Sequence, residues 1–155
     1  MRQYKVKGLA LQESSQNPYV ILEDSIEGDT ITIRIGPSEA SSLLLSLTGS
    51  IPPVPQIHDL FADLMGQQHL RAEYLSITIL DNRESSALLF YRRNFRQYSL
   101  QLKPADGIAL SFRLGIPIYL TPEAIITGTI NNPLISTQEK RMDESFLYIG
   151  DMTEV

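Results

Sequence analysis

The sequence contains no cysteine and no tryptophan among its 155 residues. Without cysteine the chain can form no disulfide bond and no thiolate metal site, and it has no cysteine nucleophile. It also lacks the run of about 18 apolar residues that a membrane-spanning helix needs, and its N-terminus has no apolar signal core. These absences predict a cytoplasmic protein without a membrane partner.

Positive charge is also scarce. Lys and Arg number 13 against 18 Asp and Glu, which gives a formal net charge of −5. This balance argues against a protein that coats nucleic acid through a wholly basic surface, although a local basic patch is still compatible with it. The length and the 43% of hydrophobic residues predict one globular domain. We place it at residues 1–130 and predict a polar, partly ordered tail over residues 131–155.

Two parts of the sequence share one pattern. Residues 19–47 align without a gap to residues 86–114, and the identical pairs are Leu22 and Leu89, Pro37 and Pro104, Leu43 and Leu110, and Leu47 and Leu114. Each part reads as a hairpin followed by a helix that begins at its proline, and alternating residues 4–11 and 74–80 predict a strand before each hairpin. We therefore predict an α+β fold: a duplicated strand-strand-strand-helix unit forms a mixed, mostly antiparallel sheet with flanking helices.

Between the two repeats, a segment with three prolines precedes a predicted amphipathic helix. Its apolar residues are Ile57, Leu60, Phe61 and Leu64. Their spacing of i, i+3, i+4 and i+7 predicts that they form the buried face. The polar residues His58, Asp59 and Asp63 are then expected to point elsewhere. A further strand is expected over residues 116–120, followed by a short helix after Thr121.

Several blocks of sequence occur in a specific order. They are residues 33–40 (IRIGPSEA), 57–61 (IHDLF), 103–110 (KPADGIAL), and Arg113 with residues 116–118. Together they resemble the bifunctional nuclease domain family over roughly residues 4–127. In that family the third block usually reads Arg-Pro-Ser-Asp-Ala-Ile-Ala-Leu-Ala, so this chain departs from it at Lys103, Ala105, Gly107 and Ser111. The resemblance implies an α+β domain, and plant members of the family are associated with hydrolysis of RNA and DNA.

Phosphodiester hydrolysis needs activated water and positive charge near the phosphate oxygens, often from divalent metals held by carboxylates. The candidate catalytic residues are His58, Asp59, Asp106 and Glu39, and the candidate ligands of Mg²⁺ or Mn²⁺ are Asp106, Glu39, Asp59 and Asp63. Glu39 and Asp106 occupy matching positions in the two repeats, so packing of the repeats can bring them together. The alternative is that each acid only complements the dipole of its own helix, and that His58 lies on a solvated helix face.

The candidate nucleic-acid-binding residues are Arg92, Arg93, Arg96, Lys103 and Arg113. The first three alternate with aromatic residues at the predicted tip of the second hairpin, where Arg can bind phosphate and aromatic rings can stack on bases. Alternatively, these charges only protect an exposed hairpin from association. Lys103 and Arg113 bracket the second predicted helix and can contact phosphate beside Asp106.

Two functions are therefore open. The first is a metal-assisted nuclease whose substrate is RNA or DNA. The second is a non-catalytic binding or regulatory module of the same fold that associates with itself. A homo-oligomer is expected in either case, because a duplicated hairpin fold often leaves apolar surface for a partner.

Overall fold

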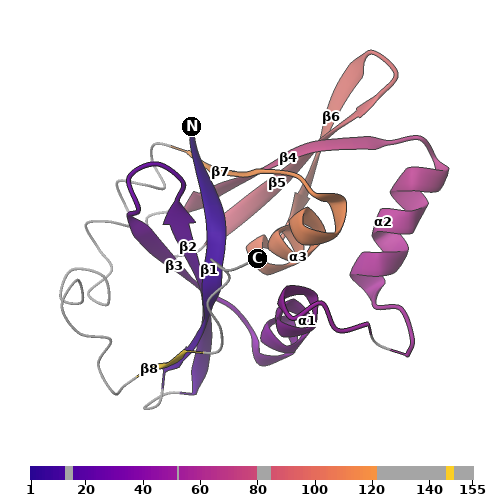
Figure 1. The fold of residues 1–155 in the computed structure, drawn as a ribbon. Coiled ribbons are helices and arrows are strands. Elements are labelled where there is room, and N and C mark those ends of the chain that lie inside the picture. Colours follow the sequence, from indigo (N-terminus) through magenta and orange to yellow (C-terminus); the bar gives the residue numbers. More distant parts are fainter. Residues whose placement is uncertain (13–15, 52, 80–84, 122–145, 149–155) are drawn as a thin grey trace.

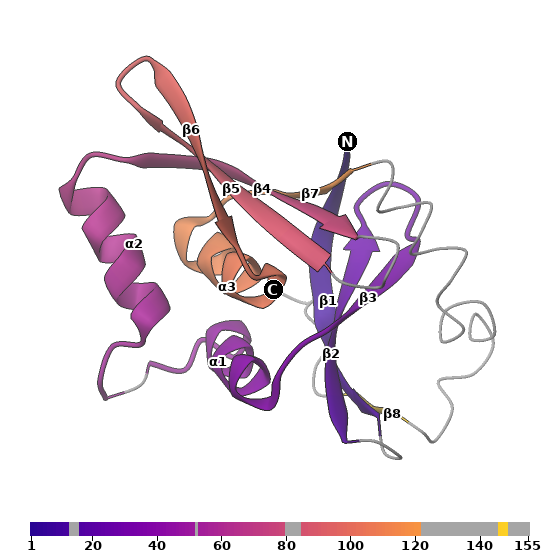
Figure 2. The same ribbon diagram turned by 180° about the vertical axis from the view of Figure 1, so that it is seen from behind.

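The computed structural model describes residues 1–12, 16–51, 53–79 and 85–121, and the backbone of residues 146–148. Its elements (Figures 1 and 2) are β1 (Arg2–Gln12), β2 (Asn17–Asp24), β3 (Thr30–Arg34), α1 (Pro37–Leu47), α2 (Ile57–Gln67), β4 (Arg71–Ile79), β5 (Ser85–Arg93), β6 (Arg96–Leu102), α3 (Pro104–Leu114), β7 (Ile118–Leu120) and β8 (Phe146–Tyr148). The order β-β-β-α occurs twice, as β1-β2-β3-α1 and as β4-β5-β6-α3. The predicted α+β class is thus confirmed, whereas a common origin of the two halves stays a prediction.

The strands form one sheet in the order β3-β2-β1-β7-β4-β5-β6, and β8 pairs with β1. The hairpin strands pair antiparallel, while β4 and β7 run parallel. Strand β7 joins the two halves, because it pairs antiparallel with β1 and parallel with β4. The sheet is therefore mixed and mostly antiparallel, as predicted. The helix expected after Thr121 lies outside the described residues, as does the tail over residues 131–155 apart from β8.

Helix α3 is the most buried helix. It contacts α1 and α2 as well as β4 and β5, and residues 107–111 are all buried. Pro104 stands at its first turn, where the missing N–H costs nothing, and Gly115 ends it with a φ of 63°. The largest side chains that are almost fully buried are Leu22, Ile31, Leu43, Leu75, Ile77, Leu89, Ile108 and Leu120. The core therefore lies between α3 and the sheet, and both halves of the domain contribute to it.

The predicted orientation of α2 is wrong. Ile57, Leu60 and Leu64 are 72%, 52% and 53% exposed, whereas His58 and Met65 are buried. The neighbouring stripe of residues 58, 61, 62 and 65 has the same spacing, and Phe61 belongs to both stripes. In the structure, the stripe that carries His58 faces the interior of the domain, and His58 makes a hydrogen bond to α3. None of the helices in the described residues is long and apolar enough to cross a membrane.

The packing of α3 against β4 can be tested with two helix glycines. A Cβ atom at Gly107 would lie 2.6 Å from Cδ1 of the buried Leu75, whereas a Cβ atom at Gly66 would have no neighbour within 4 Å. Gly66→Ala should raise the free energy of unfolding by about 0.5–1 kcal/mol through helix propensity alone. Gly107→Ala should lower the free energy of unfolding by about 1 kcal/mol, because the clash of the new Cβ atom with Leu75 outweighs the gain in helix propensity. Urea unfolding measures both changes, and equal stabilisation by the two variants would contradict this packing.

Candidate active site

The three helices each carry an acidic residue at the third helical position. They are Glu39 in α1, Asp59 in α2 and Asp106 in α3. Glu39 Oε2 accepts a hydrogen bond of 2.6 Å from the N–H of Gly36, and Asp59 Oδ2 accepts one of 2.9 Å from the N–H of Gln56. Each of these two carboxylates therefore binds a free N–H group at the start of its own helix.

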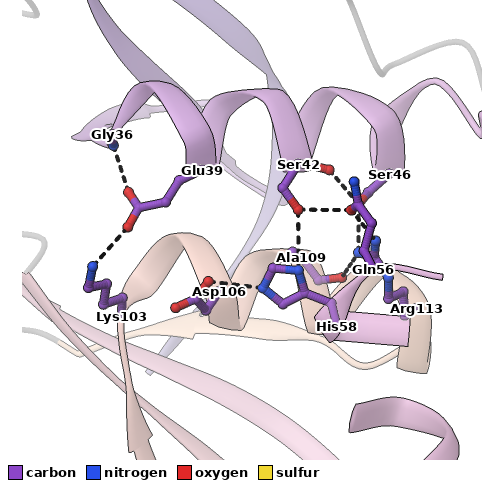
Figure 3. A network of polar contacts seen from close by, with 10 residues as sticks. All are labelled: Gly36, Glu39, Ser42, Ser46, Gln56, His58, Lys103, Asp106, Ala109 and Arg113. Carbon is purple, nitrogen blue, oxygen red and sulfur yellow. Dashed lines mark hydrogen bonds and ion pairs between the residues drawn. The ribbon is translucent and has the colours of Figure 1, made fainter. Parts of the chain in front are cut away.

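Asp106 is bonded differently from the other two acids. Its Oδ1 accepts a hydrogen bond of 2.9 Å from Nε2 of His58, which lies on α2 (Figure 3). The Asp106 side chain is 41% exposed and that of His58 is 11% exposed. The fold has thus brought together two candidate residues that lie 48 positions apart in the chain. The carboxylate is the member of the pair that solvent can reach.

The second nitrogen of His58 is also engaged. Nδ1 lies 3.2 Å from Oγ of Ser42, and this hydroxyl lies 3.0 Å from Oε1 of Gln56. A carboxylate only accepts hydrogen bonds, so the contact with Asp106 requires a proton on Nε2. The hydroxyl of Ser42 can rotate and donate its hydrogen bond either to Nδ1 of His58 or to Oε1 of Gln56. His58 therefore acts as a donor to Asp106 and has no free nitrogen for a substrate.

Ser42 was missed by the sequence analysis. A signal for it was present, since Glu39, Ser42 and Ser46 follow one another at i, i+3 and i+7 and form one polar stripe along α1. A serine stripe alone is equally typical of a solvated helix face. The role of the two serines became clear only from their partners, which are His58 of α2 for Ser42 and Arg113 of α3 for Ser46.

Arg113 connects all three helices. Its Nε donates to Oδ1 of Asp59, and its terminal nitrogens donate to Oγ of Ser46 at 2.6 Å, to the carbonyl oxygen of Ala109 at 3.2 Å and to Oε1 of Gln56 at 3.2 Å. Its side chain is only 13% exposed. The bond from Arg113, followed by the N–H of Gln56, holds the pKa of Asp59 below its usual range. The guanidinium is thus occupied by partners within the protein, and its predicted contact with phosphate stays a prediction.

Lys103 lies at the edge of this cluster. Its Nζ is 3.2 Å from Oε1 of Glu39, and its side chain is 75% exposed. An open depression of about 470 Å³ adjoins Glu39 at the start of α1, and Arg34 also lines it. Glu39 therefore pairs with Lys103 and also lines an open depression that contains Arg34.

The donor set can be compared with the needs of a divalent metal. The described residues contain no group of three or more His, Cys, Asp or Glu side chains that could hold one. Glu39 and Asp59 use both carboxylate oxygens in hydrogen bonds, and Asp63 lies exposed on α2. Asp106 uses only Oδ1 within the described part of the chain. Mg²⁺ commonly binds through one or two carboxylates together with substrate phosphates, and Asp106 fits that mode.

The remaining candidates lie elsewhere. Arg92, Arg93 and Arg96 are at the far end of the β5–β6 hairpin, which projects beyond the helices (Figure 1). The structure therefore gathers Glu39, His58, Asp59, Lys103 and Asp106 at the starts of the helices, and Arg113 reaches Asp59 from the last turn of α3. It keeps the other three arginines apart from them.

These features define an α+β domain in which a half-exposed carboxylate is held by a buried histidine between packed helices. The chain belongs to the bifunctional nuclease domain family, whose model matches residues 20–132. It is also similar to two uncharacterized proteins of Mycobacterium tuberculosis, from strains CDC 1551 and H37Rv. Each is 30% identical to this chain over 141 residues, which are 90% of this chain and 83% of the relative.

The ion pair between Asp59 and Arg113 predicts how stability depends on pH. The pKa of Asp59 is lower in the folded protein than its ordinary value of 3.8. Its stabilising contribution should therefore be complete above about pH 4 and should be lost as the pH falls towards the folded-state pKa. Asp59→Asn should be less stable than wild type at neutral pH, and the difference should shrink on acidification. Chemical unfolding at a series of pH values measures this.

Asp63→Asn is the matched control, because it removes the other acid of α2, which is exposed. This variant should keep the stability and the acid dependence that the Asp59 ion pair provides. Equal responses of the two variants would show that the contact with Arg113 contributes nothing.

Proposed function

We propose that this chain hydrolyses phosphodiester bonds of RNA or DNA, with Asp106 as the catalytic residue. The observation that carries the proposal is the hydrogen bond between His58 and Asp106 in a domain of the bifunctional nuclease family. The bond engages only Oδ1 of the Asp106 carboxylate, and this side chain is 41% exposed. A carboxylate in that state can accept a proton from attacking water.

His58 acts as a positioning residue in this mechanism. Both ring nitrogens are engaged, so the ring fixes the orientation of Asp106 while Ser42 fixes the orientation of the ring. The donated N–H also stabilises the negative charge on the carboxylate. Because the ring is buried, water cannot replace this bond at low cost.

Positive charge at the site comes from Lys103. Its exposed ammonium group stands three residues before Asp106, at the start of the same helix, and it can neutralise charge on a phosphate oxygen. Asp106 is also the residue that could hold Mg²⁺ or Mn²⁺ together with substrate phosphates, and such an ion would supply further charge neutralisation. Asp59 and Glu39 then serve mainly to hold the starts of α2 and α1.

The purified protein should cleave single-stranded RNA or DNA in the presence of Mg²⁺ or Mn²⁺. Asp106→Asn keeps the shape and one acceptor of the side chain but cannot take a proton, so it should lower kcat by a factor of about 10²–10⁴. His58→Gln should lower kcat less, by about 10- to 100-fold, because it only misplaces Asp106. Gel assays with end-labelled oligonucleotides measure these rates.

His69→Ala is the matched control for His58, because His69 is the only other histidine and is exposed. It should cleave like wild type. The nuclease assignment would be refuted if no nucleic acid were cut with either metal, or if Asp106→Asn cut as fast as wild type. Thermal unfolding of each variant separates lost chemistry from lost folding.

A second function is favoured by a specific observation. The apolar stripe of Ile57, Leu60 and Leu64 on α2 is exposed, and two apolar residues before it, Ile51 and Val54, are 94% and 74% exposed. Exposed large apolar side chains on one face of a helix are typical of an association site. We therefore keep as the second candidate a non-catalytic module of the same fold that associates with itself.

Light scattering on the full chain tests this candidate. If α2 mediates self-association, the wild type should be an oligomer, and Leu60→Asp should shift it to the monomer while keeping its circular dichroism spectrum. The matched control is Leu88→Asp, which places the same charge at an exposed leucine on the sheet. A monomeric wild type would exclude this candidate and the predicted homo-oligomer together.

A further inference from the structure

The hairpin of β5 and β6 ends in an exposed aromatic ring between two arginines. Phe95 is 97% exposed, and Arg93 and Arg96 are exposed beside it. Arg93 and Arg96 face each other in register, and Asn94 makes the turn with a φ of 54°. The large apolar side chain of Phe95, exposed at the end of this hairpin, is available to a ligand.

Arg92 differs from its two neighbours. Its Nε lies 2.7 Å from Oε1 of Glu73, and Gln97 donates to the other oxygen of the same carboxylate at 2.6 Å. Glu73 thus neutralises the charge of Arg92 and accepts hydrogen bonds from both strands of the hairpin. Arg93 and Arg96 have no ion pair within the part of the chain that the structure describes, so two positive charges remain beside Phe95.

The register places these arginines on the same side of the sheet as the candidate active site. Leu89 pairs with Leu100, Tyr91 with Tyr98 and Arg93 with Arg96, and alternate residues of a strand share one face. Leu75, the partner of Leu89 on β4, is the residue that Gly107 of α3 contacts. The two arginines therefore lie on the face that α3 covers further along the hairpin.

The tip and Asp106 are separated by the length of β6. Seven residues lead from Phe95 to Leu102, which is about 23 Å of strand at about 3.3 Å per residue, and Lys103 and α3 follow at once. At a rise of about 3.4 Å per nucleotide, a stacked strand would need about seven nucleotides to reach from one to the other. A dinucleotide bound at Asp106 cannot touch the tip.

We propose that the hairpin tip is a second, distal site that anchors single-stranded nucleic acid, with Phe95 stacking on a base while Arg93 and Arg96 bind phosphates. This role deepens the proposed function and rests on it for the link to Asp106. Stacking requires an open base face, which a single strand offers and the interior of a duplex does not. The tip then selects substrates by strandedness and by length.

The first measurement is affinity. Binding of a fluorescent single strand of about 20 nucleotides is followed by anisotropy at several salt concentrations, with Asp106→Asn as the common background so that cleavage is slow during the measurement. Phe95→Ala should weaken binding about 10-fold, as expected for the loss of one stacked base. Arg93→Gln with Arg96→Gln should reduce the slope of log K against log salt by about 1.4, since two phosphate contacts are lost. A duplex of the same length should bind more weakly and should not respond to Phe95→Ala.

Two variants in the other half of the sheet, on β1 and on the β2–β3 turn, serve as controls. Ile26→Ala removes a side chain that is 93% exposed at the turn between β2 and β3, which carries acidic residues. Lys5→Gln removes a positive charge from β1, where Nζ of Lys5 lies 3.8 Å from Oε2 of Glu23. Both should bind the strand as the background protein does. Equal losses in these controls would overturn the assignment of the tip.

The second measurement is cleavage by the full chain with Asp106 intact. Phe95→Ala should lower the ratio of kcat/KM for the long strand to kcat/KM for a dinucleotide by about 10-fold. If wild type cleaves both substrates and the ratio does not change, the anchoring role is wrong while the nuclease assignment stands. If nothing is cleaved but Phe95→Ala still weakens binding, the nuclease assignment is wrong and the anchoring site stands.

Discussion

The structure depends on how α3 is joined to the first turn of α2. Two polar pairs make this joint: Asp106 with His58, and Arg113 with Asp59. They lie about two turns apart on α3 and engage neighbouring residues of α2. Because both pairs must form together, they set the rotation of α2 about its own axis. That rotation buries His58 and places its ring between Ser42 of α1 and Asp106 of α3.

The rotation has a cost. It turns three large aliphatic residues of α2 to solvent and buries a histidine in their place, which is the reverse of what hydrophobic burial alone favours. Buried polar pairs contribute little net stability, but they define one geometry, because a misplaced partner would leave a buried group unpaired. The joint therefore specifies the position of the Asp106 carboxylate more than it stabilises the domain.

The three acidic residues at the helix starts show how one local motif acquires different roles. Glu39 and Asp59 bind the backbone N–H groups of their own helices, which is the ordinary role of an acid at this position. Asp106 holds the same position, but the histidine that reaches it comes from a different helix. Local sequence is alike in the three cases, but the partners that arrive from elsewhere in the fold differ: Lys103 for Glu39, Arg113 for Asp59 and His58 for Asp106.

The sequence by itself determined strands β1 to β7, helices α1 to α3 and their order. Alternation in the hairpins, Pro37 and Pro104 at helix starts and the glycines near helix ends act over a few neighbouring residues, so they can be read from the chain directly. It also singled out His58 and Asp106 as candidates. Only the tertiary structure decided that these two meet, that Ser42 supports them, and that α2 turns its second stripe inward. The apolar residues of α2 favour the stripe that begins at Ile57, and the opposite choice comes from contacts with α1 and α3, which lie far away in the sequence.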